Sequence, residues 1–383
     1  MINRQIEKKL KQLSTKFPVI TLNGPRQSGK TTLVKAAFPD KIYVSLEDID
    51  TRLFARNDPR GFLNTYKNAI IDEAQKVPDL FSYIQTAVDS DDVPGKYILT
   101  GSNNFLLFEK ISQSLAGRTA VLKLLPLSLV ETDENNSEIS CDEIIFRGMY
   151  PRILKDDIDP LDFYPGYIQT YIERDVRLIK NVHDLGLFQL FVKMCAGRTG
   201  QLLNLSSLAN ECGISQTTAK SWLSLLEQSY IIFLLKPHYR NFSKRLVKTP
   251  KLYFYDTGLA SYLLGIQSEE QLKTHYAKGA LFESFIISEI IKSKYNSGHE
   301  HNCYFWRDKN GTEIDCLIEK GAELIAIEIK SGQTVTNDWY KNLSYYNSIS
   351  KDIVIENMII YGGDHDQLRS SGRIISWKNL PVF

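Results

Sequence analysis

Short apolar runs alternate with amphipathic segments along the first part of the chain. Runs that predict buried strands occur at 17–23, 42–46, 69–71 and 97–99. Helical patterns such as that at 76–89 separate these runs, and Ile6, Leu10 and Leu13 recur at helical spacing before the first of them. Strands that alternate with helices are typical of a parallel sheet covered by helices. The pattern therefore predicts an α/β domain at the start of the chain.

The pattern changes beyond this first domain. Residues 132–143 are polar and acidic, which predicts an exposed loop near the end of the domain. Residues 163–235 are mostly helical in pattern, and after residue 250 strand-like and helical stretches are mixed. We therefore predict three domains, at 1–135, 136–252 and 253–383.

A glycine-rich loop follows the first predicted strand. Residues 24–31 read GPRQSGKT, which fits the pattern G-x4-G-K-[ST], and a helical pattern follows directly. Such a loop turns backbone N–H groups toward phosphates, while the lysine reaches the β and γ phosphates and the hydroxyl ligates Mg2+. A nucleotide site is therefore predicted. Its residues are Gly24, Pro25, Arg26, Gln27, Ser28, Gly29, Lys30, Thr31, Thr32 and Asp72.

Two acidic residues end the third predicted strand. Asp72 and Glu73 follow the apolar residues 69–71. In phosphoryl-transfer chemistry the first acid, together with Thr31, holds the magnesium, and the second activates the attacking water as general base. The alternative is a strand that runs into an acidic loop. The phosphate-binding loop favours the catalytic interpretation.

Other polar residues are candidates for sensing or stabilising the γ-phosphate. The strand at 97–99 continues into Thr-Gly-Ser-Asn, so that Ser102 or Asn103 follows a strand end, where ligands bind in open α/β sheets. Arg118 is a candidate charge stabiliser, acting within its own chain or across a subunit boundary. An ordinary loop and a surface arginine are the respective alternatives.

These motifs resemble a family of AAA-type ATPases of bacteria and archaea. The similarity runs along almost the whole chain and includes GPRQSGKTTL, IIDEAQ, LTGSN, LAGR, KLYFYDTGLA, FWRDKNGTEID and IEIKSG. The resemblance implies that the first domain binds and hydrolyses ATP, and it supports catalytic roles for Asn103 and Arg118. It implies no settled biological role for the C-terminal region.

The middle of the chain contains a helix-turn-helix pattern. Leu205, Leu208 and Ala209 mark one helix, Gly213 breaks it, and Ser215 can cap a second helix. The strand-like SYIIFLL that follows fits a winged helix. The residues predicted to face outward are Gln216, Thr217, Lys220 and Ser221.

A basic stretch follows this pattern. It contains His238, Arg240, Lys244, Arg245, Lys248 and Lys251. Cations of this kind bind DNA phosphates in a salt-dependent way. An internal packing module with a solvated basic loop is an equally good interpretation.

The C-terminal part contains two alternating strands that predict a hairpin. A two-residue turn at Gly321-Ala322 pairs Lys320 with Glu323 and, counted outward, Asp315 with Glu328. Glu313, Asp315, Glu328 and Lys330 then share one face of the hairpin.

This arrangement resembles the PD-(D/E)XK nuclease superfamily, with Ile314 in place of that motif's proline. The resemblance implies that Asp315, Glu328 and the helical Glu283 ligate a second Mg2+ or Mn2+, and that Lys330 assists catalysis. The alternative is an inactive fold retained for structure or for DNA binding.

Composition limits the classes of partner. The formal net charge is +1, so DNA binding requires a local basic patch. No apolar stretch reaches the length of a membrane span, and five scattered cysteines fit a reducing cytosol better than a disulfide scaffold. The prediction is a cytoplasmic protein whose partners are ATP and DNA, with no membrane, and a homo-oligomer is compatible with a role for Arg118 between subunits.

The whole sequence predicts an α/β fold in which a parallel P-loop sheet with flanking helices precedes a helical winged-helix-like domain and an α+β nuclease-like domain. The favoured function is Mg2+-dependent ATP hydrolysis that acts on nucleic acid. A nucleotide-gated switch that binds DNA or protein, with an inactive nuclease-like domain, is the alternative. An interaction protein that ignores nucleic acid is a third interpretation, based on the near-zero net charge.

Overall fold

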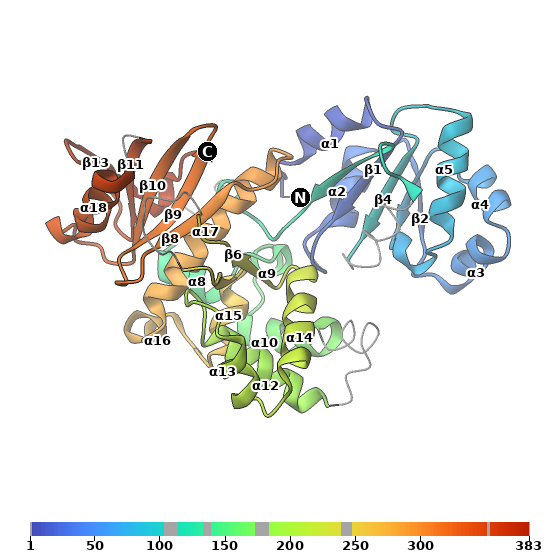
Figure 1. Cartoon of the computed structure of the whole chain (residues 1–383). Helices are drawn as coiled ribbons and strands as arrows, with labels where there is room; N and C mark the ends of the chain where they lie inside the picture. Colours follow the sequence, from blue (N-terminus) through green and yellow to red (C-terminus); the bar gives the residue numbers. More distant parts are fainter. Residues whose placement is uncertain are drawn as a thin grey trace.

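A computed structural model shows a chain built from three parts (Figure 1). It describes residues 2–102, 114–132, 139–172, 184–238, 247–350 and 353–382. An N-terminal sheet domain and a C-terminal sheet domain lie on opposite sides of the molecule, and a group of helices lies below them. The helix α17 (Lys278–Asn296) runs through the centre, where the three parts meet.

The N-terminal domain is a five-stranded parallel sheet. Its strands are β1 (Val19–Asn23), β2 (Ile42–Ser45), β3 (Ala69–Asp72), β4 (Tyr97–Gly101) and β5 (Thr119–Lys123), in the order β2-β3-β4-β1-β5. The predicted parallel sheet is confirmed, and β5 is a strand that the hydrophobic pattern had not indicated. Because β4 lies between β1 and β3, the ends of these three strands meet at one edge.

Helices cover both faces of this sheet, because successive strand residues point to opposite sides. Ile70 and Ile98 pack with α1 (Glu7–Ser14) and α2 (Lys30–Ala37), whereas Ile71 and Leu99 pack on the other face. Two helices follow β2, namely α3 (Ile49–Asn57) and α4 (Pro59–Thr65). The short helix η1 (Ala74–Lys76) and the helix α5 (Leu80–Ser90) follow β3, and the short helix α7 (Leu129–Thr132) follows β5.

The middle part is mainly helical, as the sequence indicates. It contains α8 (Cys141–Arg147), α9 (Pro151–Asp156), α10 (Pro160–Tyr167), η2 (Ile168–Ile172), α12 (Leu185–Ala196), α13 (Leu205–Glu211), α14 (Gln216–Gln228), α15 (Thr257–Leu263) and α16 (Glu269–Thr274). A two-stranded antiparallel sheet of β6 (Ile232–Leu235) and β7 (Lys251–Phe254) accompanies them.

The helices α13 and α14, joined by a short turn, lie where the sequence predicts a helix-turn-helix, and with β7 they are called the helix-turn-helix unit below. Gly213 has a φ of +65° between them, and the Ser215 hydroxyl accepts a hydrogen bond from the Thr218 N–H at the start of α14. The residues that pack α14 inward are Ala219, Trp222, Leu223, Leu225 and Leu226. The strand β7 also pairs with residues 200–203, because the N–H of Gly200 donates to the Leu252 carbonyl at 2.8 Å. β7 therefore lies inside the helix-turn-helix unit.

The C-terminal domain is a six-stranded mixed sheet. Its strands are β8 (Cys303–Arg307), β9 (Glu313–Lys320), β10 (Glu323–Lys330), β11 (Val354–Tyr361), β12 (Gln367–Arg369) and β13 (Gly372–Ser376), in the order β12-β13-β11-β10-β9-β8. The helix α18 (Lys341–Ser350), preceded by η3 (Asn337–Tyr340), packs on one face, and η4 (Trp377–Asn379) follows β13.

The predicted hairpin register is confirmed at the turn. Lys320 pairs with Glu323, and the pairing continues to Cys316 with Ile327. Gly321 has a φ of +65°, a conformation that glycine adopts without strain. Beyond Cys316 the ladder gives way to a side-chain contact, because the Asp315 carboxylate accepts a hydrogen bond of 2.8 Å from the Ile329 N–H.

The middle and C-terminal parts share one hydrophobic core. It runs from Leu125 through the helix-turn-helix residues to Trp377, and α17 supplies Phe282, Phe285 and Ile286 to it. The domain boundary predicted at residue 252 falls inside β7. Among the described residues, no helix is both long and apolar enough to cross a bilayer.

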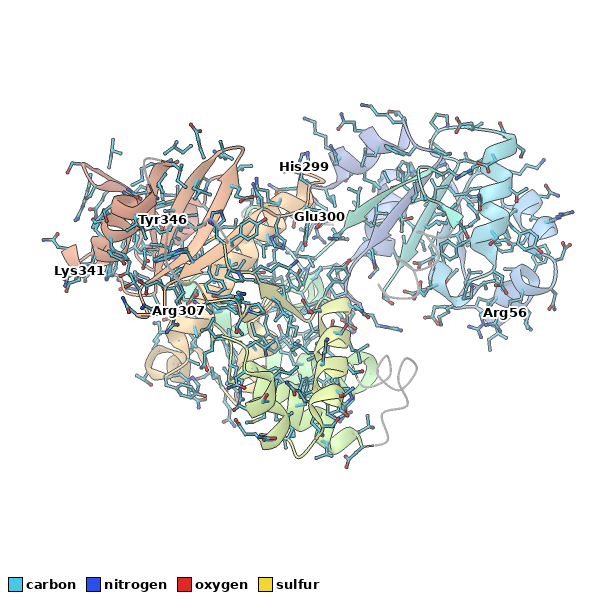
Figure 2. All side chains as sticks on the ribbon, in the orientation of Figure 1. Arg56, His299, Glu300, Arg307, Lys341 and Tyr346 are labelled. Carbon is cyan, nitrogen blue, oxygen red and sulfur yellow. The ribbon has the colours of Figure 1, made fainter. Side chains whose placement is uncertain are left out.

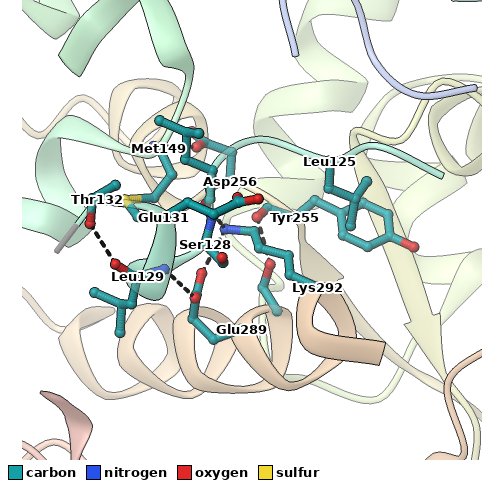
Figure 3. Close-up of polar contacts among 12 residues, drawn as sticks. Leu125, Ser128, Leu129, Glu131, Thr132, Met149, Tyr255, Asp256, Glu289 and Lys292 are labelled. Atoms are coloured by element: carbon teal, nitrogen blue, oxygen red, sulfur yellow. Dashed lines mark hydrogen bonds and ion pairs between the residues drawn. The ribbon is translucent and has the colours of Figure 1, made fainter. Parts of the chain in front are cut away.

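A buried ion pair on α17 joins the three parts (Figure 3). The Lys292 ammonium lies 2.7 Å from the Glu289 carboxylate and donates to the Leu127 carbonyl at 2.9 Å. The second oxygen of Glu289 accepts from the Leu129 N–H at 2.7 Å. Both side chains are at most 4% exposed. The segment that leaves the N-terminal sheet is therefore held to α17 by charged groups.

We predict that Lys292→Met destabilises the protein by about 3–5 kcal/mol, because it leaves the Glu289 carboxylate buried without a counter-ion. Urea unfolding followed by circular dichroism measures the change. The matched control is Lys273→Met, which removes a partly exposed lysine paired with Glu269. This variant should keep the urea concentration at the unfolding midpoint unchanged. Equal transitions for both variants would contradict the role assigned to the pair.

Candidate functional site

The phosphate-binding loop connects the end of β1 to the start of α2. Its two glycines adopt conformations that other residues rarely take, with φ of +153° at Gly24 and +90° at Gly29. A Cβ at Gly24 would lie 2.0 Å from the Leu124 carbonyl oxygen. The tight turn therefore requires glycine, and it brings the first turn of α2 to the carboxyl ends of the strands.

Lys30 lies over this loop. Its ammonium donates to the carbonyl oxygens of Gly24 at 2.9 Å and Pro25 at 2.6 Å, and the residue is 6% exposed. These neutral acceptors hold the charge inside the curve of the loop. The same ammonium is thus placed where a phosphate of a bound nucleotide belongs.

Asp72 is the centre of a hydrogen-bond network at the end of β3. Its carboxylate accepts from Thr31 at 2.9 Å, from Tyr43 at 2.7 Å and from Thr100 on the neighbouring strand β4. Burial, followed by the hydrogen bond to Asp72, raises the pKa of Tyr43 far above its usual value, so Tyr43 remains a donor. The structure thus brings Thr31 and Asp72, the two predicted magnesium-holding residues, into direct contact.

Glu73 has a left-handed backbone, with a φ of +56°. Non-glycine residues adopt this conformation rarely, and it turns the side chain away from the strand. The carboxylate accepts from Gln75 at 2.5 Å and from Ser102 at 3.2 Å. Ser102, one of the two predicted sensing residues, therefore lies beside Glu73, and Asn103, the other, falls outside the described residues.

Arg4 is a further residue of this site that the sequence did not single out. Its guanidinium donates to the Ser28 carbonyl at 2.6 Å and to the Leu125 carbonyl at 2.8 Å, and it pairs with Glu131 at 3.1 Å. It is 8% exposed. An isolated arginine before an amphipathic helix gives no signal in the sequence, because its partners lie far along the chain.

A cavity of about 770 Å³ opens beside the loop. Its walls include Lys30, Thr31 and Glu73 from the sheet domain, and Pro151 and Arg152 from α9 of the middle part. Pockets of this size accommodate ligands as large as a nucleotide. The required glycines, the curled lysine and the Thr31–Asp72 contact all fit ATP with Mg2+.

Arg118 does not reach this cavity from its own chain. It precedes β5, and its carbonyl accepts from the Val19 N–H at the start of β1, which is the edge of the sheet opposite the phosphate loop. Its guanidinium forms a salt bridge with Asp89, with one contact of 2.9 Å. The expectation of an action within the chain is therefore wrong, and an action across a subunit boundary stays a prediction.

A second cluster of charged groups lies where α17 meets β9 and β10. Glu283 comes from α17, and the hairpin supplies Glu313, Asp315, Glu328 and Lys330. The Lys330 ammonium lies 2.5 Å from Glu328 and 3.5 Å from Asp315. The structure thus brings together all the side chains that the sequence assigned to the nuclease-like site.

The grouping of carboxylate oxygens differs from the predicted one. Oxygen atoms of Glu283, Glu313 and Asp315 lie within 4.8 Å of one another, a spacing that fits one cation. Glu313 was placed on this face by the hairpin register, although it was not named as a ligand. Glu328 instead contacts Lys330, and its assignment as a ligand stays a prediction.

Lys251 was expected on a basic surface, but this expectation is wrong. It is 2% exposed, and its ammonium lies 2.9 Å from Glu283 and also contacts Glu313. His238, from the same basic stretch, is 3% exposed, and its Nε2 lies 3.1 Å from Glu319. Residues 239–246, with Arg240, Lys244 and Arg245, fall outside the described residues.

Burial raises the pKa of two acidic side chains in this cluster. It raises the pKa of the Glu283 carboxyl to about 7, although the Lys251 charge opposes the shift. Burial, followed by repulsion from Asp315, raises the pKa of Glu328 to about 8. Burial would lower the pKa of Lys330, but Asp315 and Glu328 raise it above its usual value.

Comparison with known families agrees with the N-terminal geometry. Residues 16–132 match a family model described as an AAA domain. Residues 138–270 match "Domain of unknown function (DUF8612)", and residues 278–380 match "Domain of unknown function (DUF4143)". The parallel sheet and its phosphate loop agree with the first match, which makes residues 16–132 similar to the nucleotide-binding domains of AAA-type P-loop ATPases.

Three relatives that match most of the chain carry the name "uncharacterized protein". The proteins Rv2008c of Mycobacterium tuberculosis and Mb2031c of Mycobacterium bovis are each 29% identical over 369 residues, which cover 94% of this chain and 80% of the relative. An uncharacterized protein of Haemophilus influenzae is 21% identical and covers 80% of this chain and 81% of its own length.

Solved structures give weaker similarities. The Walker-type ATPase PABY2304 of Pyrococcus abyssi has a TM-score of 0.47 and 17% identity, over 69% of this chain and 96% of that one. AMPPCP-bound DnaA from Aquifex aeolicus has a TM-score of 0.31 and 16% identity, over 58% of this chain and 86% of that one.

The raised carboxyl pKa values predict how stability depends on pH. Between its unfolded value of 4.5 and its folded value of about 8, Glu328 keeps a proton in the folded state that the unfolded state has lost. The free energy of unfolding must therefore fall as pH rises through this window. We expect thermal unfolding, measured at several pH values with a metal chelator present, to show this loss of stability. The variant Glu328→Gln should lose less stability over the same pH range. The control Glu323→Gln, at the exposed turn, should leave the loss unchanged.

Proposed function

We propose that this protein is an ATP hydrolase that uses Mg2+, and that its hydrolysis cycle acts on nucleic acid through the middle and C-terminal parts. The observation that carries the first half is that Lys30, Thr31 and Glu73 line one cavity beside a loop that requires glycine, and that Asp72 is hydrogen-bonded to Thr31. The match of residues 16–132 to an AAA domain supports it independently.

Each of these side chains has a definite task. Lys30 exchanges its loop carbonyls for phosphate oxygens, which lets the ammonium neutralise developing negative charge. The Thr31 hydroxyl and the Asp72 carboxylate, now hydrogen-bonded, would hold Mg2+, which supplies charge stabilisation at the phosphates. Glu73 orients and deprotonates the attacking water, and Ser102 holds that carboxylate at 3.2 Å.

The cavity also lies at a junction between two parts of the chain. Pro151, Arg152 and Lys155 of α9 line it opposite the phosphate loop. A nucleotide in this cavity contacts both the sheet domain and the helical part, so its hydrolysis changes the contacts between them. This placement supports a cycle that moves one part relative to the other.

The exposed face of α14 supports a nucleic-acid partner. Gln216, Thr217 and Lys220 are exposed at its amino end, and Ser221 is partly exposed. These residue types contact phosphates and base edges when a second helix of this kind enters the major groove. The buried face of the same helix packs on the core, so the helix is held rigidly.

A second candidate activity is metal-dependent cleavage of phosphodiester bonds at the C-terminal cluster. The specific observation is that Glu283, Glu313 and Asp315 gather their carboxylate oxygens beside Lys330. Such carboxylates would hold Mg2+ or Mn2+, and a neighbouring lysine steadies negative charge on the phosphate. Without cleavage, the same arrangement fits a nucleotide-gated binding switch.

The ATPase proposal is tested with three variants of the full chain. Lys30→Ala should abolish ATP binding measured by calorimetry, because the loop loses its one ammonium directed at the phosphates. Glu73→Gln should keep binding and lower turnover by roughly 100-fold or more, the usual effect of losing a general base. Lys67→Ala, an exposed lysine at the opposite edge of the sheet, is the control. Full ATP turnover in Lys30→Ala would refute the proposal.

The cleavage proposal is tested with supercoiled plasmid and Mn2+. Nicking that disappears in Glu328→Ala and in Asp315→Asn, while ATP turnover persists in both, is the expected result. Glu323→Ala on the same hairpin serves as control. If no nicking occurs at any Mn2+ concentration and a gel shift still shows salt-dependent DNA retention, the binding switch is the better description.

A further inference from the structure

The Lys251 ammonium occupies the place of a cation within the C-terminal cluster. It lies 2.9 Å from a Glu283 oxygen and directly against a Glu313 oxygen. These two residues are also two of the three whose oxygens are spaced to hold one metal ion. The lysine and a divalent cation would therefore compete for the carboxylates of the same two residues.

Lys251 comes from a different part of the chain than the carboxylates. It is the first residue of β7, which pairs with β6 and with the segment before α13. At Gly200, in that segment, a Cβ would lie 3.6 Å from the Glu283 carboxylate. The helix-turn-helix unit is thus packed directly on the acidic cluster and inserts one ammonium group into it.

The charges of the cluster are close to balance without any metal. The carboxylates are Glu283, Glu313, Asp315 and Glu328, and the cations in contact with them are Lys251, Lys330 and Arg307. Arg307 lies 3.0 Å from Glu313, where the C-terminal sheet approaches the middle helices (Figure 2). A divalent cation added to this set meets little net negative charge. Removal of one ammonium group would restore the attraction between the acidic cluster and a divalent cation.

One oxygen of the cluster is weakly satisfied. Glu328 is 1% exposed, and its Oε1 accepts no hydrogen bond of ordinary geometry among the described residues, although a contact with Asn342 lowers the pKa of the carboxyl. A buried carboxylate oxygen in this condition costs free energy unless a cation or a proton satisfies it. Together with the closely spaced oxygens of Glu283, Glu313 and Asp315, it indicates a place for a cation ligand.

We propose that Glu283, Glu313 and Asp315 form a divalent-cation site that Lys251 keeps closed, and that the metal enters when β7 withdraws this lysine. The inference rests on the proposed metal-dependent role of the cluster, and it adds a regulator to it. Because β7 belongs to the helix-turn-helix unit, a partner bound to that unit can shift the competition between lysine and metal. Lys251 is a positioning residue here, since it contacts the ligands and not a substrate.

The test is Mn2+ binding by the nucleotide-free full chain, measured by the electron paramagnetic resonance signal of free Mn2+. All variants carry Asp72→Asn so that the phosphate loop does not contribute. Lys251→Gln should bind one Mn2+ at least about tenfold more tightly than the parent, because one positive charge in contact with the site is gone. Lys251→Arg, which keeps that charge, should bind as weakly as the parent. Adding Glu283→Gln to Lys251→Gln should remove the gain.

Equal Mn2+ affinity in parent and Lys251→Gln would overturn the proposal, and so would a gain that survives Glu283→Gln. Hydrogen exchange on the unsubstituted chain gives a second test, which does not depend on the stability of any variant. Saturating Mn2+ should accelerate amide exchange in β7, and unchanged exchange would also overturn it. ATP turnover and plasmid nicking are separate readouts, so failure of either proposed activity is distinguishable from failure of this inference.

Discussion

A charge buried in a protein must be paired within it, and this requirement holds the three parts of the chain together along α17. Toward its carboxyl end, Glu289 and Lys292 form an ion pair that also binds the backbone at Leu127 and Leu129. Toward its amino end, Glu283 pairs with Lys251 of the helix-turn-helix unit. One helix therefore anchors the exit from the N-terminal sheet domain and forms one wall of the C-terminal cluster. Removal of either lysine leaves a carboxylate without its counter-ion, fully buried at Glu289 and partly buried at Glu283.

The same exit segment is also bonded to the nucleotide site. Arg4 donates to the Leu125 carbonyl and to the Ser28 carbonyl of the phosphate loop, while Lys292 holds the Leu127 carbonyl two residues further on. A rearrangement of the loop around a phosphate therefore acts on a segment that α17 holds from the other side. The salt bridge between Lys123 and Glu300, at 2.6 Å, adds a contact between β5 and the residues after α17 (Figure 2). These contacts give the proposed ATP cycle a physical connection to the rest of the molecule.

The sequence predicts what depends on local chemistry and misses what depends on distant partners. The phosphate loop, Asp72 and Glu73 were recognised because their residue types follow strands at fixed spacing. The hairpin register near the turn was recognised because a two-residue turn at Gly321-Ala322 fixes the pairing from Lys320 to Cys316. Arg4 and Lys251 were not recognised as site residues, because their partners lie 127 and 32 residues away. The family resemblance supported a catalytic role for Arg118, but the strand that follows this residue begins at the opposite edge of the sheet. Residue type alone does not reveal such placement.

Two lysines show how the same residue type can have different roles in different surroundings. Lys30 and Lys251 are both nearly buried ammonium groups, and each is held by oxygen atoms at a site suited to another ion. Lys30 donates to neutral carbonyls of its own loop, and such acceptors bind an ammonium group less strongly than carboxylates do. Lys251 is held by carboxylates from α17 and β9, whose charge makes its release costly. An anion can therefore enter the first site by attraction alone, whereas a metal can enter the second only when the strand that carries the lysine moves.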